Sequence, residues 1–293
     1  MGRTPIFMVD LHSHTDCSDG LFSPGRLVEL ACNNRLSALG ITDHDTLDGY
    51  DQAVPHARAA GLDLVCGIEL SGRFRGKTVH VLGYFLEEPA GPPFRRHIAE
   101  LKQSRRDRNR RLAERLRSLG LDVTLEEAER LGKDQTGRPH FARLLMQKGY
   151  VENYRDAFDR YLDESAPGFV ERDEPSLRRV FGWILESNGI PVWAHPGRFI
   201  ANEGKEPSEL FAEIADHGCL GIEAYHRDHT IDQAERFVNA ARGLGMGVTG
   251  GSDFHGPAPN GVPLGGLRLP DSLLEEFRSF GKQALETMAQ RKV

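Results

Sequence analysis

The stretch IFMVDLHSH, residues 6–14, joins a short apolar run to two histidines that follow it directly. Residues 6–11 predict a strand that ends in polar residues. Side chains two positions apart lie on the same face of an extended chain, so His12 and His14 can bind one ion. The same arrangement, an apolar run followed by residues that can bind metal, recurs along the chain.

Working outward from this stretch, short apolar runs alternate with helical patterns. The first part of the chain predicts strands at residues 6–11, 36–42, 62–70 and 73–85, and helices at 24–34 and 47–60. The last part predicts strands at residues 191–194, 220–224 and 246–250, and helices at 176–187, 208–217, 231–243 and 271–291. Such alternation favours parallel strands joined by right-handed crossovers. About seven strand–helix units favour an α/β barrel over an open sheet.

Between residues 94 and 175 the strand pattern disappears, and the sequence becomes helical and highly charged. Ten Lys or Arg and three Asp or Glu lie between Arg95 and Arg117, in a chain whose formal net charge is −6. We therefore predict a barrel formed by residues 1–93 and 176–293, with a helical insertion at 94–175. Arg105 and Arg108 continue the apolar stripe of the basic helix, either to meet an anion or with their stems at its edge.

The composition narrows the class of protein. Of the 293 residues 39% are hydrophobic and 27% charged, which excludes a disordered chain. No apolar run is long enough to span a membrane, and the acidic balance argues against a generic nucleic-acid coat. The four cysteines form no C-x-x-C pair, and no secretory signal is evident at the N-terminus. We therefore expect a cytoplasmic enzyme without disulfides or a membrane partner.

Residues of the types that bind metal ions accompany most of the predicted strands. They are His12, His14, Asp19, His44, Glu69, His80, His195, Asp253 and His255. A barrel gathers the carboxyl ends of its strands around one mouth, where these imidazoles and carboxylates would be costly to bury together without cations. Taken singly, Asp19 could be a turn residue and His44 or His80 an ordinary core or surface histidine. Their joint placement predicts a metal centre with nitrogen and oxygen ligands.

The motifs D-L-H-S-H-T (10–15), I-T-D-H-D (41–45), G-I-E (67–69), A-H-P (194–196) and G-S-D-F-H (251–255) resemble those of the PHP (polymerase and histidinol phosphatase) family. The resemblance implies a distorted (β/α)7 barrel with a trinuclear, catalytic metal site. It implies a first ion bound by His12, His14, Glu69 and Asp253. It also implies a second ion shared by Glu69, His80 and His195, and a third bound by Asp19, His44 and His255. Ligands of this kind suit Mn²⁺, which we favour, as well as Fe²⁺ or Zn²⁺.

The helical insertion and the motifs G-R-P-H (137–140), W-A-H-P-G-R (193–198) and E-A-Y-H-R-D-H-T (223–230) resemble one PHP subgroup. That resemblance implies a phosphoric monoester hydrolase that removes the 3′-phosphate of nucleoside 3′,5′-bisphosphates such as adenosine 3′,5′-bisphosphate (pAp), by attack of a metal-activated hydroxide. The alternatives are a 5′-to-3′ exoribonuclease on short RNA and a histidinol-phosphate-type phosphatase of small monoesters. Rivals of another class are a non-catalytic metal-binding module and an RNA-binding scaffold, but no aromatic residues accompany the basic helix for base stacking.

Six residues are candidates for substrate binding: Thr136, Arg138, His140, Arg143, Arg198 and His226. The first four surround the predicted start of a helix, whose free N–H groups and positive potential suit a phosphate. The alternative there is an ordinary capped helix. Arg198 and His226 follow predicted strand ends, and the alternative for His226 is an exposed loop histidine.

Overall fold

A computed structural model describes residues 8–132, 136–171, 173–258 and 261–291. The chain divides into two compact units, which we call the barrel unit (Met1–Arg95 and Glu174–Val293) and the helical unit (Arg96–Asp173). Each unit has its own core, and each is described by itself below. Of the strand expected at residues 6–11, Ile6 and Phe7 lie outside the described residues.

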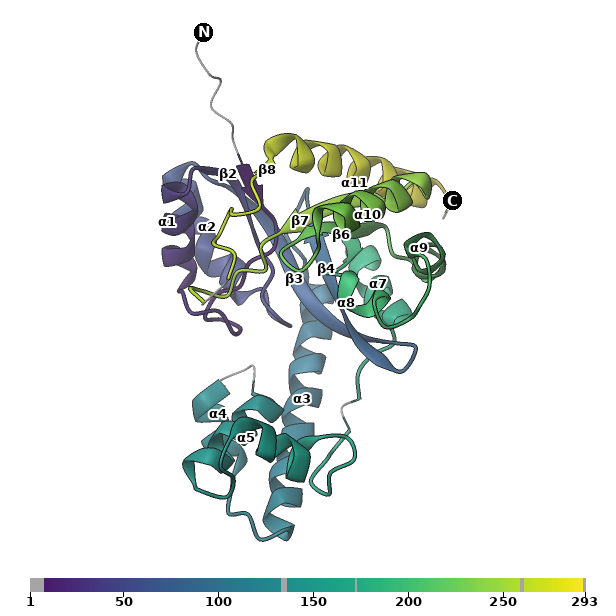
Figure 1. Cartoon of the computed structure of the whole chain (residues 1–293). Coiled ribbons are helices and arrows are strands. Elements are labelled where there is room, and N and C mark those ends of the chain that lie inside the picture. Colours follow the sequence, from purple (N-terminus) through teal and green to yellow (C-terminus); the bar gives the residue numbers. More distant parts are fainter. Residues whose placement is uncertain (1–7, 133–135, 172, 259–260, 292–293) are drawn as a thin grey trace. The chain divides into compact units, whose positions relative to one another are not determined.

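The barrel unit contains one eight-stranded sheet, in the order β7-β6-β5-β4-β3-β2-β1-β8. Figure 1 labels most of these strands. The strands are β1 (Met8–Asp10), β2 (Leu36–Ile41), β3 (Asp63–Phe74), β4 (Lys77–Phe85), β5 (Ile190–Trp193), β6 (Gly221–His226), β7 (Gly247–Gly251) and β8 (Leu269–Pro270). The sheet nearly closes on itself between β1 and β7, where the N–H of Leu11 donates to the carbonyl of Gly250 at 3.3 Å. The predicted α/β barrel is therefore confirmed.

The direction of β4 corrects the expectation of parallel strands. β1, β2 and β3 are parallel, as are β5, β6 and β7, whereas β4 is antiparallel to both β3 and β5. A tight turn joins β3 to β4, in which Arg75 and Gly76 have φ of 47° and 76°, as in the mirror-image turns that suit hairpins. Because β4 runs opposite to β3 and β5, its first residues lie at the end of the barrel where those two strands finish.

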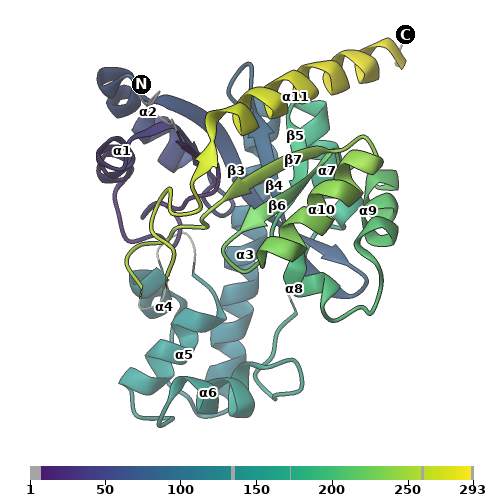
Figure 2. The same ribbon diagram turned by 45° about the horizontal axis from the view of Figure 1, so that its top comes forward.

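Helices surround this sheet in Figures 1 and 2. They are α1 (Pro24–Asn33), α2 (Asp48–Ala60), α7 (Leu177–Glu186), α8 (Gly197–Ile200), α9 (Pro207–Asp216), α10 (Ile231–Gly243) and α11 (Asp271–Arg291). Their ends follow the local sequence: Ser23 caps α1 by accepting the N–H of Arg26 at 3.4 Å, and Gly61 ends α2 with a φ of 67°. Leu27, Leu39 and Phe254 are among the buried residues where helices and strands pack together.

The helical unit contains most of α3 (Pro92–Ser118), then α4 (Leu125–Gly132), α5 (Arg138–Gln147), α6 (Tyr154–Ala157) and a π-helical turn (Phe158–Leu162). Its core includes the fully buried Leu116, Phe141 and Leu145. Arg108 on α3 is only 7% exposed, so it belongs to the inward face, whereas Arg110 is exposed. Among the described residues, no helix of either unit has the length and apolar character to cross a membrane.

Candidate metal centre

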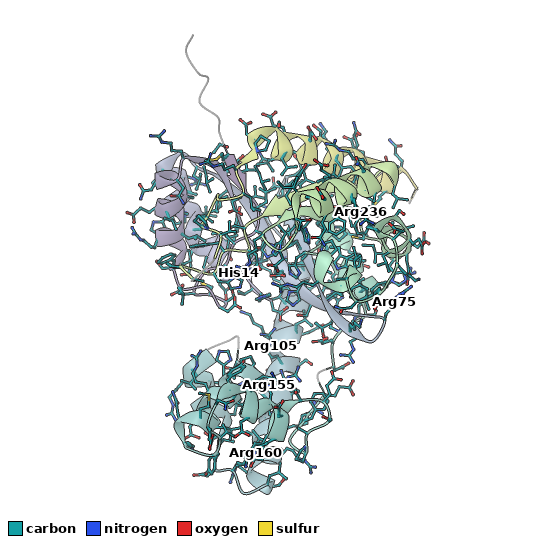
Figure 3. All side chains as sticks on the ribbon, in the orientation of Figure 1. His14, Arg75, Arg105, Arg155, Arg160 and Arg236 are labelled. Atoms are coloured by element: carbon teal, nitrogen blue, oxygen red, sulfur yellow. The ribbon has the colours of Figure 1, made fainter. Side chains whose placement is uncertain are left out.

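The nine residues expected to bind metal come together at one end of the barrel unit. Their positions follow from the strands: His12, His14 and Asp19 after β1, His44 after β2, Glu69 in β3, His80 in β4, His195 after β5, and Asp253 and His255 after β7. Figure 3 labels one of them, His14, in the barrel unit. His80 reaches this end from an early position in β4, because β4 is antiparallel to its neighbours.

The first group consists of His12, His14, Glu69 and Asp253, all buried. His12 Nε2 lies 3.1 Å from His14 Nε2, 3.2 Å from Glu69 Oε2 and 3.4 Å from Asp253 Oδ1. Four donors placed tetrahedrally about 2.1 Å from one ion would be roughly 3.4 Å apart. The four side chains therefore fit around a single divalent cation with little movement.

Glu69 faces histidines with both of its carboxylate oxygens. Oε1 lies 2.8 Å from His80 Nδ1 and 3.1 Å from His195 Nε2, while Oε2 faces His12 and lies 3.4 Å from His44 Nδ1. Among the described residues, His44, Glu69 and His80 form a second group of convergent ligand atoms, whereas the resemblance implied His195 in the place of His44. A carboxylate in this position can bridge two ions, one on each oxygen.

A third group, more open to solvent, consists of His14, Asp19, His44 and His255. Asp19 Oδ1 lies 3.2 Å from His255 Nε2 and 3.6 Å from His14 Nδ1, and Asp19 Oδ2 lies 3.8 Å from His44 Nε2. The family resemblance did not include His14 here. Its two ring nitrogens face two different groups, a feature that only the tertiary structure reveals.

Mutual electrostatics show why this cluster needs positive charge. Burial opposes the charge of Glu69, but His44, His80 and His12 outweigh it and hold the pKa of this carboxyl well below its usual range. Burial also opposes protonation of His14, yet hydrogen bonds with Asp253 and Glu69 raise its pKa to about 10. In contrast, burial lowers the pKa of His44 to about 4. The carboxylates thus remain anionic and keep neighbouring imidazoles such as that of His14 protonated. Divalent cations can take the place of these protons.

Three buried carboxylates behind the ligands were missed by sequence reasoning. Asp10 accepts the N–H groups of Ser252 at 2.9 Å and Gly265 at 2.8 Å. Asp43 accepts the N–H and the hydroxyl of Thr15, both at 2.7 Å. These bonds hold the loops that carry the ligands. The available signal for all three was their place within quoted motifs: Asp10 in D-L-H-S-H, Asp43 in I-T-D-H-D, and Glu223 at the start of E-A-Y-H-R-D-H-T.

Four substrate-binding candidates lie at or near the start of α5 in the helical unit. Thr136 is buried, and its carbonyl accepts from Asn109 Nδ2 at 2.7 Å. Arg138 donates to the carbonyl of Leu162 at 3.3 Å, with its guanidinium 5.6 Å from the centre of the Phe169 ring. His140 Nδ1 accepts the N–H of Gly137 at 3.1 Å and so caps the helix, while Arg143 is exposed.

The other two candidates lie in the barrel unit. Arg198 forms an ion pair with Asp228 and lines a pocket of about 280 Å³ together with His80 and His195. His226 is not the exposed loop histidine that the sequence left open, because it is 2% exposed. Its Nε2 lies 3.5 Å from Asp253 Oδ2, and its Nδ1 accepts the N–H of Asp228 at 3.1 Å.

Comparisons with known proteins show which family and which relatives the chain is similar to. The family model described as the PHP domain matches residues 10–171. A 3′,5′-nucleoside bisphosphate phosphatase of Chromobacterium violaceum is 32% identical, over 88% of this chain and 90% of that protein. A 5′-3′ exoribonuclease of Haemophilus influenzae is 30% identical, over 92% of this chain and 98% of that protein. A structure from Bifidobacterium adolescentis, provisionally described as a metal-dependent phosphoesterase, is 30% identical with a TM-score of 0.76, over 95% of this chain and 98% of that one.

Proposed function

From the premise that this chain belongs to the PHP domain family, we propose that it removes the 3′-phosphate of nucleoside 3′,5′-bisphosphates such as pAp. It is a metal-dependent phosphoesterase, and the proposal concerns its substrate and its ions. The observation that carries the proposal is the set of three overlapping ligand groups. Each pair of groups shares one residue, which is His14, His44 or Glu69. We propose Mn²⁺ as the ion, with up to three bound.

When bound, divalent ions activate water as a nucleophile and neutralise charge on the phosphoryl oxygens. The protein would hold them through His12, His14 and Asp253 on one side of Glu69, and through His80 and His195 on the other. Arg198 lines the pocket beside His80 and His195, where its guanidinium can pair with a phosphate in place of Asp228.

We assign the substrate's 5′-phosphate to the start of α5. Arg138, His140 and Arg143 supply positive charge or hydrogen-bond donors at this helix N-terminus, close in sequence to Thr136. A 5′-phosphate anchor would make the next phosphate the one that is hydrolysed. A terminal 3′-phosphate then gives phosphatase activity, and a 3′,5′-diester gives exonuclease activity.

The second candidate function is therefore 5′-to-3′ degradation of short RNA. It is favoured by the Haemophilus influenzae exoribonuclease, which aligns over 98% of its own length. The same residues would serve both reactions, so the two functions differ only in what is attached to the 3′-phosphate.

Steady-state kinetics on three substrates test the proposal. Protein stripped with EDTA and refilled with Mn²⁺ would be given pAp, a 5′-phosphorylated oligoribonucleotide and histidinol phosphate. We expect the highest kcat/KM for pAp, with AMP and phosphate as products. A higher value for the oligoribonucleotide would select the exoribonuclease, and a higher value for histidinol phosphate would select a small-monoester phosphatase. If the stripped protein hydrolyses all three at the undiminished rate, the metal mechanism is wrong.

A further inference from the structure

Glu223 lies in β6, behind the metal ligands, and its side chain is completely buried. Each of its carboxylate oxygens meets a different predicted ligand residue. Oε1 lies 2.8 Å from His12 Nδ1, and Oε2 accepts the backbone N–H of His195 at 2.8 Å. Both hydrogen bonds join residues that are far apart in the sequence, so this arrangement exists only in the folded barrel.

The contact with His12 determines which ring nitrogen can bind an ion. An ionised carboxylate only accepts hydrogen bonds, so the His12 nitrogen that faces Glu223 carries the proton. In the neutral ring, the lone pair is then on Nε2, which points at Glu69 and Asp253 from 3.2 Å and 3.4 Å. A carboxylate behind a ligand histidine commonly sets its tautomer and its ring orientation in this way.

The contact with His195 acts through the backbone. His195 has a φ of 32°, in the left-handed region that residues other than glycine adopt only when their surroundings impose it. The hydrogen bond from its N–H to Glu223 helps to hold this conformation directly after β5. The imidazole is thereby placed with Nε2 3.1 Å from Glu69 Oε1.

His12 and His195 face opposite oxygens of Glu69, so one carboxylate connects the two sides of the bridging ligand. We propose that Glu223 is a positioning residue that couples two ion sites, by holding His12 in one and His195 in the other without binding an ion itself. Among the described residues, neither Glu223 nor His195 belongs to a group of convergent ligand atoms; His195 is assigned to the second site through its 3.1 Å contact with Glu69 Oε1. The proposal rests on the proposed metal-dependent activity, but not on which phosphoester is the substrate.

Glu223→Gln is the sharpest test because glutamine has the same shape but only one acceptor oxygen. It can accept from His12 or from the His195 N–H, but not from both, and its NH₂ group then faces the remaining partner. If that partner is His12, the ring must accept at Nδ1 and carry its proton on Nε2, where the ion should bind. Glu223→Asp keeps the charge but is one methylene too short to meet both partners.

Mn²⁺ binding would be measured without substrate, by calorimetry and by metal analysis after equilibrium dialysis. This readout does not depend on whether pAp is the substrate. We expect Kd to rise roughly 10- to 100-fold for Glu223→Gln in at least two ion sites, with kcat recovering towards the wild-type value at saturating Mn²⁺. Glu223→Asp should show the same direction of change. Glu209→Gln, at an exposed carboxylate on α9, is the matched control and should bind Mn²⁺ as the wild type does.

Two results would overturn the proposal. One is wild-type Mn²⁺ affinity in a folded Glu223→Gln protein. The other is a low kcat that persists when all ions are bound, which would mean that Glu223 acts in the reaction instead of in positioning. Should Glu223→Gln fail to fold, the same measurements on Glu223→Asp decide the question by the same criteria.

Discussion

His80 Nδ1 lies 2.8 Å from Glu69 Oε1, across the antiparallel pair formed by β3 and β4. Glu69 is directly opposite Leu82, two positions beyond His80, so His80 and Glu69 are diagonal neighbours on one face of the sheet. This relationship aims one oxygen of Glu69 away from the first group of ligands. The bridging position that we propose for Glu69 thus depends on the reversed direction of β4.

Replacing Glu69 should therefore disrupt more than one ion site. We expect Glu69→Gln to lower kcat at fixed Mn²⁺ by at least about 100-fold, because an amide nitrogen cannot act as a ligand on one side. Metal analysis should show fewer bound ions per chain. Glu209→Gln serves as the control, and a Glu69→Gln protein with the full metal content and normal kcat would contradict the bridging role.

The raised pKa of His14 predicts opposite pH effects on stability and on metal binding. In the metal-free protein the pKa rises from 6.5 to about 10, so protonation of His14 stabilises the fold fully below about pH 6.5. This contribution is lost as the pH rises through about 10. Thermal unfolding of metal-free protein should accordingly show Tm falling between pH 7 and 10, with a smaller fall in His14→Gln.

Over the same interval, Mn²⁺ affinity should increase with pH, because the ion must displace protons from His14 and its neighbours. Calorimetry in buffers of different ionisation enthalpy would count the protons released. Binding without proton release at pH 7 would show that the cluster is already deprotonated.

The phosphate anchor predicts a difference between substrates. Arg138→Ala should raise KM for pAp roughly 10- to 100-fold, as expected for a lost charge-assisted hydrogen bond, and leave KM for a simple aryl phosphate nearly unchanged. Arg111→Ala, at an exposed position on α3, is the control. Equal effects of Arg138→Ala on both substrates would contradict phosphate binding by Arg138. Circular dichroism would check that the variant is folded.

Closure of the barrel predicts a contrast between two glycines. A Cβ at Gly251 in β7 would lie 2.3 Å from the backbone nitrogen of His12, so Gly251→Ala must push β7 away from the first ligand. We expect a loss of about 1–3 kcal/mol in the free energy of unfolding and weaker Mn²⁺ binding.

Gly243→Ala is the matched control, because a Cβ at that helical position meets nothing within 4 Å. It should leave stability unchanged or raise it by up to about 1 kcal/mol. Chemical denaturation of both variants would measure the difference. Equal stabilities would mean that the barrel relaxes around Gly251 without cost.

Much of this architecture could be predicted from local sequence. The helix predicted at residues 231–243 is α10 (Ile231–Gly243), and the one predicted at 271–291 is α11 (Asp271–Arg291). Helix caps, apolar periodicity and the glycines or prolines that end helices and strands act over a few residues. They therefore predict these elements without knowledge of the fold. Ligand-type residues next to strands could be found in the same way, because a barrel brings strand ends together whatever its detailed packing.

Strand direction and partnership were decided only by the tertiary structure. The apolar pattern of residues 73–85 is the same for either direction, so the pattern did not place His80 beside Glu69; only the family resemblance implied that the two share an ion. Nor did the E-A-Y-H-R-D-H-T motif reveal the role of Glu223, whose two partners are 211 and 28 residues away. A sequence pattern indicates which face of a helix or strand a side chain lies on. The role of a buried carboxylate depends instead on the hydrogen-bond donors that distant segments bring to it.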